Sequence, residues 1–224
     1  MSFLLTVRNL LYREMRLELN TGQLLGAMLL FSLLAAVLFS MAFSPGADIA
    51  AYFPGVFWFS QVFAVLLVLN RAISREKENG CLELVILAGS SREAVMVARI
   101  LANLIFFLLL SLIITPIFSF LFDLFLGRYL FYLLLVVLVF QLGLAITGSI
   151  MSYLVSLTRL SGLLLPVLLL PLLLPLLLGA VETTSLLLGQ FRSGSFYFWI
   201  MFMLLYDLIY FALAVWAAPY LLEV

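Results

Sequence analysis

Six apolar runs, each long enough to cross a bilayer, constrain this sequence more than any other feature. They lie near residues 22–43, 53–70, 100–122, 129–155, 162–182 and 196–218. A helix needs roughly 20 apolar residues to cross a ~30 Å hydrocarbon core. Hydrophobic residues make up 67% of the chain, against ~45–50% in soluble domains. We therefore predict an all-α polytopic membrane protein, with six transmembrane helices forming one domain over residues 1–224.

The lysines and arginines between these runs predict the orientation of the chain. The first run is too long for a signal-peptide core, so we expect it to be retained as a span. A cytoplasmic N-terminus would place nine basic residues inside and two outside, as the positive-inside rule requires. We expect a bacterial inner (plasma) membrane protein with both termini cytoplasmic. The inner set is Arg8, Arg13, Arg16, Arg71, Arg75, Lys77, Arg92, Arg99 and Arg159, and the outer set is Arg128 and Arg192.

Residues 1–21 precede the first apolar run and show helical amphipathicity. Phe3, Val7 and Leu10 share one side of a helical wheel, while Arg13 and Arg16 fall on the other. This pattern predicts an interfacial helix with its arginines toward anionic headgroups. Glu14 and Glu18 fall on the apolar side. They either pair with arginines of residues 71–99 or extend to the edge of the interface.

Residues 71–99 hold nine charged residues between two apolar runs, so water must reach this segment. Gly80 and residues 89–91 predict breaks between short helices. The piece between them, Cys81–Ala88, is apolar apart from Glu83. It could rest on lipid headgroups as an interfacial helix. We favour a second interpretation, a helix that docks into a groove of a soluble partner.

Three polar residues, Gln61, Gln141 and Asp207, fall near the middle of their spans. A carboxylate there costs ~2.5–3.5 kcal/mol on insertion scales, so Asp207 should face the bundle interior or a wet cavity. The three are interpreted either as polar contacts between helices or as polar points along a transport path.

The fourth and fifth spans carry residues that affect helix packing. Pro166, Pro171 and Pro175 interrupt the fifth span, and each removes a backbone hydrogen bond. They predict a bent, buried helix or a hinge. In the fourth span, small residues recur in two pairs, each four residues apart, and favour close helix approach. These are Gly143, Thr147, Gly148 and Ser152.

The sequence gives no support for an enzyme. It has no histidine and one cysteine, which excludes a histidine base, a multi-cysteine metal site and a disulfide within the chain. No phosphate-binding glycine loop or metalloprotease motif is found. We expect no catalytic, metal or cofactor-binding residue, and a net charge of zero gives no basic stripe for nucleic acid. Energy for any transport would come from a partner.

Residues Glu76–Leu87, EKENGCLELVIL, followed by SREA at Ser91–Ala94, resemble the signature of ABC-2-type permeases. In that superfamily the segment lies after the second span, and its short helix docks into the ATP-binding subunit. Cys81 departs from the serine or threonine usual in relatives, which would cap the helix better. The resemblance implies an ATPase-coupling role for Glu76, Gly80, Cys81, Leu82, Glu83, Leu84, Val85, Leu87 and Arg92.

The whole chain is similar to the CcmB family, the permeases of cytochrome c maturation. The similarity rests on REMRLE at Arg13–Glu18, PGVFWFSQVFAVLLVLNR at Pro54–Arg71 and LLPVLLLPLLLPLLLGA at Leu164–Ala180. It implies a permease dimer in an A2B2 core with a CcmA-like cytoplasmic ATPase that binds ATP. It also implies CcmC- and CcmD-like membrane partners and a CcmE-like carrier, with haem held on the partners.

Two alternatives stay open at this point. The same architecture would serve an ABC-2-type exporter of a lipid, polyketide or drug. A non-transporting membrane scaffold would also fit the sequence.

Overall fold

The computed structural model describes residues 3–43, 49–79, 91–124, 126–156, 161–189 and 193–221. Within these ranges the chain is helical, without a strand. The elements are α1 (Phe3–Thr21), α2 (Gln23–Ala42), α3 (Ile49–Asn79), α5 (Arg92–Leu121), the 3-10 turn η1 (Leu126–Tyr129), α6 (Leu130–Ser156), α7 (Ser161–Leu188) and α8 (Ser193–Leu221).

Six of these helices, α2, α3 and α5–α8, are long and apolar enough to cross a membrane. The prediction of a six-span, all-α membrane protein is confirmed. Two of the helices run well past their apolar cores: α3 continues from Asn70 to Asn79, and α5 begins at Arg92 rather than near residue 100. Both extensions carry charged residues. They can stay helical outside the hydrocarbon core because a helix forms its backbone hydrogen bonds within itself.

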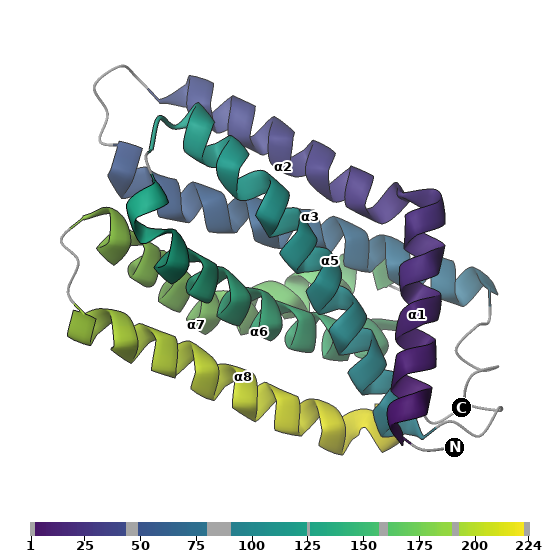
Figure 1. The fold of residues 1–224 in the computed structure, drawn as a ribbon. Helices are drawn as coiled ribbons and strands as arrows, with labels where there is room; N and C mark the ends of the chain where they lie inside the picture. Colours follow the sequence, from purple (N-terminus) through teal and green to yellow (C-terminus); the bar gives the residue numbers. More distant parts are fainter. Residues whose placement is uncertain are drawn as a thin grey trace.

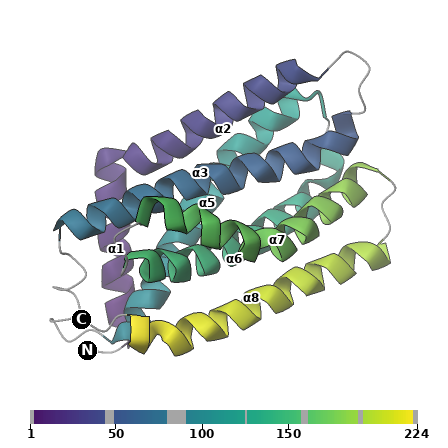
Figure 2. The same ribbon diagram turned by 180° about the vertical axis from the view of Figure 1, so that it is seen from behind.

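Helix α6 lies at the centre of the bundle and contacts α3, α5, α7 and α8, whereas α2 covers α3 and α5 from outside (Figure 1). Seen from behind, α7 packs beside α3 and α8 (Figure 2). Small residues make the central position of α6 feasible, because they let neighbouring backbones approach closely. An added Cβ at Gly148, for example, would lie 2.8 Å from Leu69 Cδ1 of α3.

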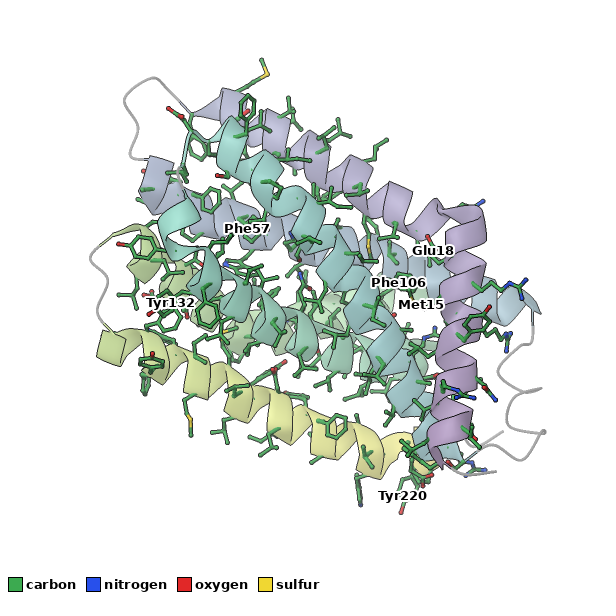
Figure 3. The ribbon with its side chains drawn as sticks, viewed as in Figure 1. Met15, Glu18, Phe57, Phe106, Tyr132 and Tyr220 are labelled. Atoms are coloured by element: carbon green, nitrogen blue, oxygen red, sulfur yellow. The ribbon has the colours of Figure 1, made fainter. Side chains whose placement is uncertain are left out.

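Aromatic rings fill the bundle between the N-terminal part of α3 and the C-terminal end of α5. Phe57 is fully buried there (Figure 3). Its ring lies 5.4 Å from the Phe118 ring in an edge-to-face arrangement and 4.9 Å from Trp58. Trp58 in turn lies 4.4 Å from Phe140 of α6. Such pairs add ~0.5–1.5 kcal/mol each beyond area burial, so this end of the bundle is firmly packed.

Helix α7 is a single helix through all three of its prolines. The side of α7 that faces the bundle carries fully buried residues spaced three or four positions apart. They are Leu165, Leu169, Leu173, Leu176 and Ala180. Pro171 lies on the exposed side. A hinge role for the prolines stays a prediction.

Helix α1 lies across the end of the bundle, at the end where both termini lie (Figure 1), and packs mainly against α5. The sharp corner into α2 is formed at Gly22, whose φ is +57°. The Glu18 side chain closes the corner (Figure 3): its Oε1 accepts hydrogen bonds from the backbone N–H groups of Leu24 (2.7 Å) and Leu25 (3.0 Å). A carboxylate thus caps the first turn of α2, where free N–H groups favour negative charge.

The corner gives a matched pair of glycine substitutions. Gly22→Ala should lower the free energy of unfolding by ~1–2 kcal/mol, because a Cβ is strained in the left-handed conformation. Gly26→Ala should raise it by up to ~1 kcal/mol, since Gly26 is helical and an added Cβ there meets nothing within 4 Å. Denaturant unfolding of the two variants in detergent measures both changes. An equal effect at the two positions would contradict this account of the corner.

Candidate functional site: the polar interior and the end of the bundle at α1

A ladder of polar contacts joins the antiparallel helices α5 and α6. Arg99 stacks over the ring of Tyr153, with Cζ 5.6 Å from the ring centroid. One turn further along α5, Asn103 Nδ2 donates to Ser149 Oγ at 2.9 Å. Each step of four residues along α5 is matched by four residues back along α6. The contacts therefore fix the register of the two helices over several turns.

The same register ends at a buried cluster in the middle of the bundle, where α3 joins α5 and α6. Gln141 Nε2 donates to Ser111 Oγ at 2.5 Å and to Gln61 Oε1 at 3.3 Å. Ser111 Oγ also lies 3.3 Å from Gln61 Oε1 and 2.9 Å from its own helix's Phe107 O. All three side chains are fully buried. The structure thus brings together two residues that the sequence singled out, Gln61 and Gln141, through a serine that it did not.

Asp207, the third intramembrane polar residue of the sequence analysis, lies apart from this cluster. Its side chain is 3% exposed and projects from α8 toward α6 and α7. Neither carboxyl oxygen has a hydrogen-bond partner among the described residues. An added Cβ at Gly143 would lie 2.8 Å from Leu176 Cδ2 and closer still to Asp207 Oδ1. Gly143 of α6 therefore provides the space that the carboxyl group occupies.

Two further hydrogen bonds fasten α7 to its neighbours. Trp58 Nε1 of α3 donates to Thr184 Oγ1 at 3.0 Å, and Tyr206 Oη of α8 donates to the carbonyl of Leu172 at 3.0 Å. The second bond meets α7 between Pro171 and Pro175, where prolines have removed backbone donors. The proline-rich helix is thus held on both sides.

The end of the bundle at α1 carries the two coupling residues that the structure describes, Glu76 and Arg92. Helix α3 ends there at Asn79 and α5 begins at Arg92. Arg92 Nη1 donates to the carbonyl of Pro219 at 2.8 Å, which ties the start of α5 to the end of α8. Glu76 lies in the last turns of α3. The remaining coupling residues, Gly80, Cys81, Leu82, Glu83, Leu84, Val85 and Leu87, lie outside the described residues.

The structure refines the expectations for α1. Glu18 is buried and caps α2, rather than reaching the edge of an interface, whereas Glu14 is half-buried. Arg13 is half-buried and Arg16 is exposed. That α1 rests on a membrane surface stays a prediction. No group of three potential metal ligands is found among the described residues.

Known proteins of similar sequence identify the family of this chain. Residues 5–224 match the family model described as CcmB protein. The chain belongs to the CcmB family. A member of similar sequence is "Heme exporter protein B" of Rhodobacter capsulatus, 33% identical over 98 residues. That alignment covers 43% of this chain and 45% of the relative, less than half of the curated relative. Family membership and the six apolar helices make this a multi-pass membrane protein.

Sequence reasoning missed Arg99, Asn103 and Ser111 as members of the interior contacts of this CcmB-family chain. A signal was present, because these residues recur on one face of α5 at multiples of four. Arg92 was assigned to the coupling segment, but its bond to Pro219 joins residues 127 positions apart. No local pattern indicates such a contact.

The packing of Gly143 against Asp207 can be tested by a double-mutant cycle. Gly143→Ala should destabilise the protein by ~1–3 kcal/mol through overpacking. In an Asp207→Ala background the loss should shrink by at least ~0.5 kcal/mol, since one of the two overlaps is gone. Unfolding in detergent measures each variant.

Gly148→Ala serves as the matched control for this cycle. Its added Cβ meets only Leu69, so its cost should be the same in both backgrounds. Additive losses for Gly143→Ala and Asp207→Ala would show that the two residues do not share the space.

Proposed function

We propose that this chain is the membrane permease subunit of an ABC-type complex for cytochrome c maturation. On this proposal it couples ATP hydrolysis by a partner ATPase to the delivery of haem or the release of the haem-loaded carrier. The observation that carries the proposal is the family match over residues 5–224. The name of the relative, "Heme exporter protein B", supports haem export as the process served.

The contacts of α5 support a coupling role. Helix α5 starts directly after residues 80–90, which resemble the docking segment of ABC-2-type permeases. At its first turn Arg92 is bonded to Pro219 of α8, and deeper in the bundle Asn103 and Ser111 are bonded to α6. A displacement of this end of α5 would therefore be transmitted to α6 and α8 through hydrogen bonds as well as through apolar packing.

We further propose that the ATPase is CcmA-like and binds on the cytoplasmic side, against residues 71–99. Leu82, Leu84, Val85 and Leu87 would supply apolar contacts, and Glu83 would pair with a basic group of the ATPase. The protein would work as a dimer in an A2B2 core. CcmC- and CcmD-like proteins and a CcmE-like carrier would complete the assembly in a bacterial inner membrane.

In this proposal haem is held by the partners and ATP by the ATPase. The chain has no histidine, the residue most often used as an axial haem ligand. It would act as a mechanical coupler in the assembly and carry no catalytic residue of its own. Gln61 and Gln141, which bond to each other and to Ser111, would then hold α3, α5 and α6 together during the coupled movement.

The docking assignment is tested by reversing one charge. Glu83→Lys should leave the protein in the membrane but lower co-purification of the ATPase about tenfold, because a charge at an interface is replaced by its opposite. Glu182→Lys is the control, since Glu182 is exposed near the other end of the bundle, on α7. Unchanged recovery of the ATPase with Glu83→Lys would refute docking through this segment.

The role in cytochrome maturation is tested separately, by haem staining of membrane proteins from a strain that lacks the gene. Covalent haem bands should vanish, return with the wild-type gene, and return weakly or not at all with Glu83→Lys. Normal bands in the deletion strain would overturn the proposed function and favour an ABC-2-type exporter of another substrate.

A further inference from the structure

A cavity of about 670 Å³ opens between α1, the first turns of α5 and the C-terminal part of α8. Its polar lining comes from Thr6, Ser91 and Glu93, and its apolar lining includes Val97, Phe211 and Val215. It lies at the end of the bundle that α1 crosses (Figure 1). Arg92, the coupling residue whose side chain the structure describes, is absent from the described lining.

At the start of α5 the lining changes from polar to apolar along the helix, and α8 contributes apolar residues. Ser91 and Glu93 belong to the beginning of α5, whereas Val97 lies one turn deeper, ~6 Å along the axis from Glu93 at a rise of about 1.5 Å per residue. Phe211 and Val215 of α8 lie one to two turns inside Pro219. Polar residues of α5 thus line the outer part of the cavity and apolar residues of α5 and α8 line the inner part. A lipid at a bilayer surface is arranged in the same way, with its headgroup outside and its acyl chains inside.

The charge of the lining selects the headgroup. Glu93 is the one charged residue among the described residues that line the cavity, and no lysine or arginine accompanies it. Arg92, the preceding residue in the chain, donates a hydrogen bond from Nη1 to the carbonyl of Pro219. An anionic headgroup would be repelled, and a cationic one would be attracted. Thr6 and Ser91 add hydroxyl oxygens that accept hydrogen bonds.

A primary ammonium satisfies these groups better than a quaternary one. It has three N–H donors for the Glu93 carboxylate and the two hydroxyls, whereas a trimethylated ammonium has none. Deeper on α8, Phe211 remains 41% exposed, which leaves apolar surface for an acyl chain to cover. From the cavity, the polar-to-apolar order of its α5 and α8 lining and the negative charge of Glu93 among the described residues, we infer that it binds an aminophospholipid of the surrounding bilayer, with the ammonium on Glu93.

The test uses the full-length protein in complex with its partners, reconstituted in nanodiscs with equal parts of phosphatidylethanolamine, phosphatidylglycerol and phosphatidylcholine of identical acyl chains. After release into mild detergent, native mass spectrometry counts the lipids that stay bound. Wild type should retain phosphatidylethanolamine about tenfold over the other two, as expected for a charge-assisted hydrogen bond. Glu93→Gln should bring the three lipids within about twofold of one another.

Two further variants separate the headgroup from the cavity. Val215→Trp should fill the apolar part and lower the retention of all three lipids. Glu182→Gln removes an exposed carboxylate elsewhere on the bundle and should keep the wild-type pattern. Equal retention of the three lipids by wild type, or an unchanged preference in Glu93→Gln, would overturn the proposal.

A second measurement distinguishes lipid from protein as the occupant. A photo-reactive amino acid placed at Val215 in cells should crosslink to phospholipid. Crosslinking to a partner polypeptide instead would overturn the proposal and identify the cavity as a docking site for a neighbouring membrane helix. Both outcomes are independent of haem staining and of ATPase recovery.

Discussion

Thr147, Ser149 and Ser152 of α6 donate their hydroxyl hydrogens to carbonyls of their own helix, one turn back. In the hydrocarbon core of a membrane no water is present to bond polar groups, so a buried hydroxyl without a partner in the protein is costly. By bonding to its own backbone, α6 presents small, satisfied side chains to four neighbouring helices. The close packing of the whole bundle depends on this arrangement.

Some of the other buried polar side chains form hydrogen bonds between helices, whereas the Asp207 carboxyl group has no partner among the described residues. Asn103 and Ser111 fix α5 against α6, Gln61 joins the same cluster from α3, and Trp58 bonds to Thr184 of α7. Each such bond is worth only ~0.6 kcal/mol on average in a membrane protein. Their value is directional, because they specify register where apolar packing alone would allow helices to slide.

At the end of the bundle at α1, charged side chains form contacts that hold the helix ends in place. Glu18 caps α2 and Arg92 bonds to Pro219, so a carboxylate and a guanidinium group each stabilise a helix end. The corner at Gly22 places α1 against the start of α5. As a result, the start of α5 lies between α1 and the end of α8.

The apolar runs by themselves determined that six helices cross a membrane, since length and hydropathy are local properties of the chain. The runs also showed that Gln61, Gln141 and Asp207 are polar residues near the middle of apolar spans. Which residues meet was decided only by tertiary structure: Ser111 links the two glutamines, Gly143 makes room for Asp207, and Glu18 caps α2. Such pairings depend on the rotation of each helix about its own axis, and nearly uniform apolar runs such as the leucine-rich α7 carry little information on that rotation.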